Sequence, residues 1–390
     1  MIRLIKSSYY REGFVRKKLS EFILKTKQVS FGPECLKFER RFAKWQKRKY
    51  CVFVSSGSAA NIAIVQTLLN TGKIKKGDMV GFSALTWSTN VMPLLQLGLI
   101  PFPVDVELDT LNISSKKLIN VINKHKIKML FITNLLGFCD DIDNIQKICK
   151  KENIILIEDN CESLGTVYKK KLLGNYGLAS TFSFYVGHHM STIEGGAICT
   201  DNEKLANMLR IVRAHGWDRN LTQKNKEIIR NKHKINSEFY SRYTFYDLGY
   251  NLRPTEISGF IGNIQIDFLN EIIKKRNENF FKISPFIYKQ TSKFFPIRHD
   301  HIDFLSNFAI PVICKSEKIR DDLVSKCEDK LELRPIVGGD ITSQPFFQKY
   351  MKVNNENVEN ARLIHKQGLY FGNNPELTKE EINQILSLIN

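Results

Sequence analysis

The chain has 390 residues, of which 43% are hydrophobic and 25% charged, and it carries a formal net charge of +18. This length suits two domains, and the composition excludes a disordered or low-complexity chain. No apolar run approaches the roughly 20 residues that cross a bilayer, and the N-terminal residues lack the apolar stretch of a signal peptide. We therefore expect a globular, cytoplasmic protein without a membrane segment.

The basic residues form short, separate clusters, for example at 16–18, 73–76, 169–171 and 274–276. No long stripe of arginines and aromatic residues accompanies them, although such a stripe is typical of nucleic-acid-binding surfaces. We expect a lysine-rich solvated surface and no nucleic-acid partner, with local binding of small anions left open.

The eight cysteines include no Cys-x-x-Cys pair, and the closest two, Cys139 and Cys149, are ten residues apart. In a cytoplasmic chain, cysteines spaced in this way are more often small buried hydrophobic residues than disulfides or metal ligands. We expect no metal site.

The first half of the chain alternates between two kinds of predicted element. Short runs rich in Val, Ile and Phe predict buried parallel strands at 51–54, 79–82, 100–104, 129–133 and 154–158. Helical stretches lie between them at 59–69, 90–97, 114–123 and 142–151. This order is typical of a doubly wound α/β sheet, in which ligands bind at the carboxyl ends of the strands.

The pattern changes after residue 177. Two further strands are predicted at 180–185 and 197–200, followed by a helix at 203–213 and a long, partly mobile polar loop at 218–240. A helix is predicted to begin near Pro254 and to run past Lys274. We expect a large α/β domain over 1–265 and a smaller C-terminal α+β domain over 266–390.

Two segments at predicted strand ends could carry chemistry. Residues 55–61, Ser-Ser-Gly-Ser-Ala-Ala-Asn, open a predicted helix, where free N–H groups and hydroxyls can bind a phosphate. Asp159 follows an Ile-rich strand, where a carboxylate can pair with a protonated ring nitrogen. The alternatives are an ordinary serine N-cap for the first segment and an aspartate that caps the next turn for the second.

A third segment, residues 180–196, combines a serine at a strand end, paired histidines and a Glu-Gly-Gly turn. Here the chain resembles the DegT/DnrJ/EryC1/StrS sugar aminotransferases, which are fold-type I enzymes dependent on pyridoxal 5′-phosphate (PLP). That family has a lysine, five residues after the serine, that forms a Schiff base with the cofactor. This sequence keeps Ser183 and the turn, but His188 stands at the lysine position. The resemblance continues in residues 31–42, 55–61, 105–112 and 249–256.

The resemblance implies roles for individual residues. Asp159 would pair with the pyridine nitrogen, and Glu162 stands where relatives carry a glutamine near the phenolic oxygen. Trp87 would stack on the cofactor ring, although a core tryptophan is the alternative. The phosphate would be held by Gly57, Ser58 and Ser183, joined by Asn251 from the second subunit of a homodimer.

The residues around His188 and the segment 213–220 further resemble the nucleotide-sugar 3-dehydratases of this family, in which histidine replaces the lysine. The resemblance implies C3 dehydration of a nucleotide-linked 4-keto-6-deoxyhexose, with pyridoxamine 5′-phosphate (PMP) regenerated by glutamate. GDP-4-keto-6-deoxymannose is the expected substrate. The sequence does not separate GDP from CDP or UDP as the nucleotide. His188 would be the base. His215 would orient the substrate or His188, or only cap a helix.

Two alternatives accompany this prediction. One is an enzyme similar to the CDP-4-keto-6-deoxyhexose 3-dehydrases, which carry an iron–sulfur cluster. Only Cys314 and Cys327 follow Cys199, which is too few for four late ligands, so no cluster is expected. The other is a non-catalytic protein that binds PLP or a nucleotide sugar, in which His188 marks a lost activity.

Overall fold

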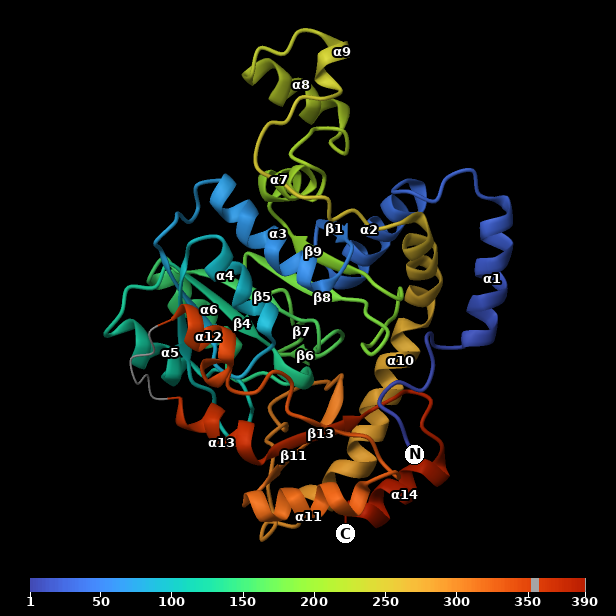
Figure 1. The fold of residues 1–390 in the computed structure, drawn as a ribbon, viewed down its shortest axis with the longest axis vertical. Helices are drawn as coiled ribbons and strands as arrows, with labels where there is room; N and C mark the ends of the chain where they lie inside the picture. The colour runs from blue at the N-terminus through green and yellow to red at the C-terminus, as the bar shows by residue number, and fades with distance from the viewer. Residues whose placement is uncertain (352–357, 390) are drawn as a thin grey trace.

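The computed structural model describes residues 1–351 and 358–389. A seven-stranded sheet and a four-stranded sheet both lie beside the long helix α10 (Glu256–Tyr288), as Figure 1 shows. Helix α1 (Glu12–Lys25) lies along the outer side of α10. The position that the sequence predicts as the domain boundary, 265, falls inside α10. Here the large domain means the part built around the seven-stranded sheet, and the small domain means the part built around the four-stranded sheet.

The large sheet has the order β1-β9-β8-β5-β4-β2-β3. Its strands are β1 (Tyr50–Val54), β2 (Met79–Ser83), β3 (Ile100–Val104), β4 (Met129–Thr133), β5 (Ile155–Asp159), β8 (Ala179–Ser183) and β9 (Gly196–Thr200). The fold class predicted from the sequence is therefore confirmed, and every predicted strand is present. The prediction of a parallel pairing for β1 is wrong, because its neighbour β9 is antiparallel both to it and to β8.

Helices cover both faces of this sheet and bury its apolar strands. They are α2 (Pro33–Gln46), α3 (Gly57–Asn70), α4 (Met92–Gln96), α5 (Ser115–Ile122), α6 (Ile142–Lys151) and α7 (Glu203–Arg213). Side chains of α3, α4 and α7 form one cluster with the strands, while α2 and α10 pack on the opposite face. Since parallel strands buried on both faces need apolar side chains throughout, the Val- and Ile-rich runs form these strands.

An arm between α7 and α10 projects from the top of the molecule in Figure 1. It contains α8 (Gln223–Lys232) and α9 (Glu238–Ser241), where the sequence predicts only a loop. No residue of α8 is buried, so the helix lacks the apolar stripe from which a sequence pattern predicts helices. The side chain of Thr222 caps its first turn by accepting a hydrogen bond from the N–H of Asn225.

The second sheet has the order β10-β11-β13-β12. Its strands are β10 (Phe294–Phe295), β11 (Ala309–Cys314), β12 (Leu333–Pro335) and β13 (Gly368–Gly372), and the helices of this part of the chain are α11 (Glu317–Cys327), α12 (Pro345–Tyr350), α13 (Glu359–Gln367) and α14 (Lys379–Ile389). Helices α11 and α13 pack on this sheet and α14 packs on α10 and α11, whereas α12 packs on Phe82 of the large sheet. A hairpin of β6 (Val167–Tyr168) and β7 (Lys171–Leu172) completes the described strands.

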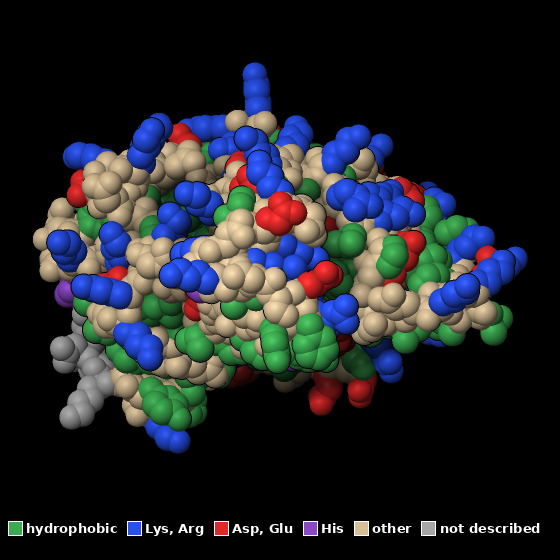
Figure 2. Space-filling model, turned by 90° about the horizontal axis from the view of Figure 1, so that it is seen from above, with side chains coloured by type: hydrophobic (Ala, Val, Ile, Leu, Met, Phe, Trp, Pro, Cys, Tyr) green, Lys and Arg blue, Asp and Glu red, His purple; other side chains and the backbone are tan. Residues whose placement is uncertain are grey.

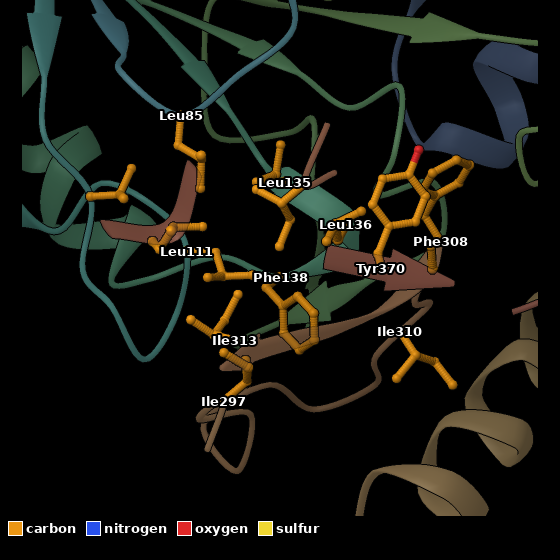
Figure 3. Packing of buried hydrophobic residues seen from close by; sticks show 14 of the residues in the cluster. Leu85, Leu111, Leu135, Leu136, Phe138, Ile297, Phe308, Ile310, Ile313 and Tyr370 are labelled. Atoms are coloured by element: carbon orange, nitrogen blue, oxygen red, sulfur yellow. The ribbon is translucent and has the colours of Figure 1, made fainter. Parts of the chain in front are cut away.

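One apolar cluster joins the two sheets. Figure 3 shows Phe138 of the large domain beside Ile313 of the small sheet, in one cluster with Leu135 and Leu136. The small domain is therefore fixed beside the ends of β4 and β5, where a site was predicted.

The surface carries its positive charge in a dispersed form. In Figure 2, Lys and Arg side chains are spread over the face in view, interspersed with a few Asp and Glu. Within 1–351 and 358–389, no helix has both the length and the apolar character needed to cross a membrane.

Candidate active site

A cavity of about 300 Å³ opens at the carboxyl ends of the large sheet's strands. Seven of the nine residues proposed from the sequence line it together: Gly57, Ser58, Trp87, Asp159, Glu162, Ser183 and His188. The small domain closes its other side with Phe308, Arg334 and Tyr370. Figure 3 shows Phe308 beside Tyr370 at the edge of the shared core, and their ring centroids are 6.3 Å apart.

The N-terminus of α3 forms one wall. Ser56 is its N-cap, and its Oγ accepts a hydrogen bond of 3.0 Å from the N–H of Ala59. Ser56 is thus an ordinary N-cap, but this does not exclude a phosphate site. The first N–H groups of the helix, at Gly57 and Ser58, stay available to a ligand. A Cβ on Gly57 would lie 2.7 Å from the Cβ of Ser183, so this wall accepts only glycine without rearrangement.

Asp159, the last residue of β5, is buried in the cavity floor. Its Oδ2 accepts hydrogen bonds from the side-chain amides of Asn61 (3.0 Å) and Asn90 (2.7 Å), and its Oδ1 accepts one from the N–H of Cys161 (2.9 Å). Among the described residues, no lysine or arginine forms an ion pair with this carboxylate. A buried carboxylate that is held in place but lacks a cationic partner suits a cationic group of a ligand.

His188 lies in the loop between β8 and β9. Its Nδ1 is 2.6 Å from the carbonyl oxygen of Cys161, and this oxygen can only accept, so Nδ1 carries the proton and Nε2 is left with a lone pair. Burial lowers the pKa of His188, and the positive charge of Arg276 adds to this effect, while the Cys161 carbonyl and Asp159 oppose it. The ring is therefore a neutral base near neutral pH.

Glu162 contributes a second carboxyl group to the cavity. Its Oε2 accepts a 3.0 Å hydrogen bond from the N–H of Leu136, whose backbone lies in the left-handed region with φ of 54°. Burial raises the pKa of Glu162 to about 8, a rise that the Leu136 N–H opposes and the charge of Asp159 supports. At neutral pH its other oxygen can thus donate a hydrogen bond, as a glutamine amide would.

Trp87 lies at the mouth of the cavity and is 53% exposed, so the alternative of a core tryptophan is wrong. A flat indole surface that is partly exposed at a cavity wall can stack on a planar ligand.

His215 and Asn251 do not line this cavity; both lie at the base of the arm. The N–H of His215 donates to the carbonyl of Tyr250 (2.7 Å), and its ring packs edge to face on Trp217 with centroids 4.9 Å apart. Asn251 is exposed, and its Oδ1 accepts a 2.9 Å hydrogen bond from Nε of Arg253.

Sequence reasoning missed several residues of the site. Asn90 lies directly after the Thr-Trp-Ser-Thr run, and Asn61 lies within the phosphate segment, so each had a local signal but no assigned role. Phe308 and Tyr370 come from the small domain, and no motif in the sequence marks them. In the described part of the chain, no group of three His, Cys, Asp or Glu side chains could hold a metal ion, and none of the cavity-lining residues is a lysine.

The residues present fit PLP. The unpaired, buried carboxylate of Asp159 matches a protonated pyridine nitrogen, the α3 N-terminus with its glycine matches a phosphate, and Trp87 offers a stacking surface. These three features lie on different walls of one cavity, as a ring with a phosphate arm requires.

Comparison with known proteins agrees with this geometry. The sequence pattern of the DegT/DnrJ/EryC1/StrS aminotransferase family matches residues 14–390. GDP-4-keto-6-deoxy-D-mannose 3-dehydratase of Escherichia coli O55:H7 is 36% identical over 384 residues, which cover 95% of this chain and 96% of that protein. The structure of the E. coli GDP-4-keto-6-deoxy-D-mannose-3-dehydratase with bound hydrated PLP has a TM-score of 0.91 at 33% identity, covering 100% of this chain and 99% of that one. A GDP-4-keto-6-deoxymannose-3-dehydratase structure with a trapped PLP-glutamate geminal diamine also has a TM-score of 0.91 at 33% identity and covers 100% of both chains.

Proposed function

Because this chain belongs to the DegT/DnrJ/EryC1/StrS aminotransferase family, we propose that it is a PLP-dependent 3-dehydratase of GDP-4-keto-6-deoxymannose. PMP is the working form of the cofactor, and glutamate is the amino donor that regenerates it, in line with the PLP-glutamate adduct named for a similar enzyme. The reaction removes the C3 hydroxyl group of the sugar and releases ammonia.

The observation that carries this proposal is the state of His188. Its Nδ1–H is bound to the Cys161 carbonyl, so Nε2 is the nitrogen that can accept a proton from a bound ligand. The same nitrogen can return that proton to the C3 hydroxyl as the C–O bond breaks, so that water leaves rather than hydroxide. Histidine cannot form the covalent link to PLP that lysine forms, and no described cavity-lining residue is a lysine.

The other residues of the cavity bind and orient the cofactor. When bound, PLP supplies an electron sink next to the sugar carbon that reacts. Asp159 holds the charge of the pyridine nitrogen, and two asparagine amides keep its carboxylate in place. Gly57, Ser58 and Ser183 hold the phosphate, and Glu162 in its protonated form donates to the phenolic oxygen.

We further propose a homodimer in which Asn251 and His215 of each subunit serve the cavity of the other. Both residues lie outside the cavity of their own chain, at the base of an arm that projects from the body (Figure 1). The dimer and the cytoplasmic location stay predictions from the sequence.

The test is a measurement of product mass. Purified protein is incubated with PLP, glutamate and GDP-4-keto-6-deoxymannose, and the nucleotide sugar, ammonia and 2-oxoglutarate are quantified. We expect a sugar product lighter by one oxygen atom, with one ammonia and one 2-oxoglutarate formed for each product. The His188→Asn variant should keep its PLP absorbance but form no such product.

The other outcomes are equally informative. An amino sugar would show that transamination proceeds without the lysine and would overturn the role of His188. No change in the GDP sugar, followed by turnover of the CDP or UDP analogue, would correct only the nucleotide. Binding of PLP without turnover of any of the three would support the non-catalytic alternative.

A further inference from the structure

Arg276 lies in the middle of α10 and is 4% exposed, yet no carboxylate in the described part of the chain forms an ion pair with it. A buried guanidinium without a counter-ion is costly, because it loses hydration and gains no opposite charge. Its Nε atom also has no hydrogen-bond partner. The other two guanidinium nitrogens account for all its hydrogen bonds.

These two nitrogens donate only to backbone carbonyl groups. Nη1 donates to the carbonyls of Phe308 (2.8 Å) and Asn373 (2.6 Å), and Nη2 donates to the carbonyl of His188 (3.1 Å). The three acceptors belong to the small domain and to the loop between β8 and β9. Arg276 thus fastens the loop that carries His188 to the small domain.

Arg276 also holds the residue against which the His188 ring packs. The ring of Phe308 lies 5.1 Å from the ring of His188, centroid to centroid, and both rings line the cavity. Since Arg276 bonds the carbonyls of both residues, a change at Arg276 would move the imidazole and the ring against which it packs.

We propose that Arg276 is a positioning residue for His188, whose guanidinium anchors the loop by its hydrogen bond to the His188 carbonyl and whose uncompensated charge disfavours the imidazolium. The proposal rests on the function proposed above for His188. Arg276 itself is not among the residues that line the large cavity.

Other charged and titratable groups also face His188. The ones from the cavity side are Asp159, Cys161, Glu162, Tyr185, Arg334 and Tyr370, together with Glu194 at the end of its own loop. On the opposite side, a small polar cavity of about 30 Å³ brings it near Tyr9, Tyr10, His189 and Glu376. The carboxylates favour the imidazolium, whereas Arg276 disfavours it, and the buried position of Arg276 leaves its charge poorly screened.

The pKa directions agree with this geometry. Burial is the largest cause of the lowered pKa of both His188 and its neighbour His189, and the charge of Arg276 lowers both, as the second cause for His189 and as the smallest of four for His188. Burial also lowers the pKa of Arg276 itself to about 9, so the guanidinium stays charged at neutral pH.

The experiment compares Arg276→Met with wild type by NMR titration of histidines labelled at Cε1, in protein loaded with PLP and without sugar substrate. His188→Asn assigns the signal. Removal of the positive charge should raise the titration midpoint of His188. Arg276→Lys restores the charge and should return the midpoint toward the wild-type value.

The matched control is Lys274→Met, which removes a positive charge from an exposed position of the same helix, two residues away. It should leave the midpoint unchanged. Equal midpoints in wild type and Arg276→Met would overturn the proposal and leave Arg276 a purely structural role. Because the readout needs no turnover, it is independent of whether the sugar substrate is correct.

If circular dichroism shows that Arg276→Met does not fold, the wild-type protein is compared with Arg276→Gln instead. A His188 midpoint clearly below the ordinary value of about 6.5, together with its return toward that value in folded Arg276→Gln, supports the proposal. A wild-type midpoint at or above that value overturns it.

Discussion

One hydrogen bond decides which nitrogen of His188 is available to a ligand. Because the carbonyl of Cys161 takes the Nδ1 proton, the imidazole presents Nε2 as an acceptor, and Asp159 lies two residues before that carbonyl at the end of β5. The base and the carboxylate that would hold the cofactor are therefore positioned by one short backbone segment. A change in the β5 turn would displace both.

The absence of a lysine from the described cavity wall leads to a trapping prediction. With His188→Lys, borohydride should fix PLP to the introduced lysine, because an amine would then lie where the imidazole now is. Peptide mass spectrometry locates the label. Wild-type protein treated in the same way should carry no label near position 188. A stoichiometric label on another lysine of wild type would contradict the assignment of the cavity.

Glu162 should give the apoprotein a distinctive pH dependence. Its pKa in the folded chain, about 8, exceeds the ordinary value of a glutamate, so the folded state holds a proton that the unfolded state releases. Stability contributed by this proton is present at low pH and is lost as pH rises toward 8. Glu162→Gln cannot lose a proton and should escape this loss.

Thermal unfolding of the two apoproteins from pH 5 to pH 9 checks this. The melting temperature of Glu162→Gln, relative to wild type, should increase from pH 5 to about pH 8 and level off above it. Glu194→Gln is the matched control, because Glu194 lines the same cavity but is exposed. A constant difference across the pH range would show that Glu162 is ionised throughout.

Among the elements, α2, α7 and β1 meet at a buried ion pair. Arg213, which is fully buried at the end of α7, donates to Glu39 of α2 and to the carbonyl of Phe53 (2.8 Å). The same oxygen of Glu39 accepts a 2.9 Å hydrogen bond from the N–H of Phe53. The pair thereby ties two helices on opposite faces of the sheet to its edge strand.

Breaking this pair should be costly. Arg213→Met leaves the carboxylate of Glu39 buried and unpaired, and should lower the free energy of unfolding by about 3–5 kcal/mol. The double variant Glu39→Gln, Arg213→Met removes both charges while keeping an acceptor for the Phe53 N–H, so it should lose less than Arg213→Met alone. Urea denaturation measures both. Additive losses would mean that the two side chains do not interact.

The elements also show what a sequence can reveal. The strands of the large sheet were predictable because each is buried on both faces and therefore reads as a continuous apolar run. Asp159 and the 55–61 segment were predictable because they follow such runs directly. Helix α8 was not, because none of its residues is buried and its sequence carries only a capping threonine. Phe308 and Tyr370 reach the cavity through tertiary packing across the shared core, which leaves no local pattern in the sequence.

In the whole molecule, the cavity is formed by two domains that share one apolar core. Helix α10 passes from the large domain to the small one, and Arg276 in its middle bonds to backbone on both sides. Domain movement would therefore change the surroundings of His188. The arm, unlike the two domains, projects from the body. It exposes large apolar side chains, including Phe239, Tyr240 and Leu248.

The proposed dimer predicts that two inactive variants restore activity when they are mixed. If His188 of one subunit and Asn251 of the other complete one site, His188→Asn and Asn251→Ala should each abolish activity alone. A heterodimer of the two variants contains one site with both native residues. Random reassembly of equal amounts, followed by measurement of 3-dehydration, should thus restore about a quarter of the wild-type activity.

The control separates shared sites from mere stabilisation. Mixing His188→Asn with Asp159→Ala should restore nothing beyond background, because both residues line the cavity of the same chain and every heterodimeric site then lacks one of them. The masses of the mixed species, checked by native mass spectrometry, show whether heterodimers formed. Full activity of Asn251→Ala alone, or an active monomer, would remove Asn251 from the site. Recovery only in the first mixture would show that the arm of one copy completes the cavity of its neighbour.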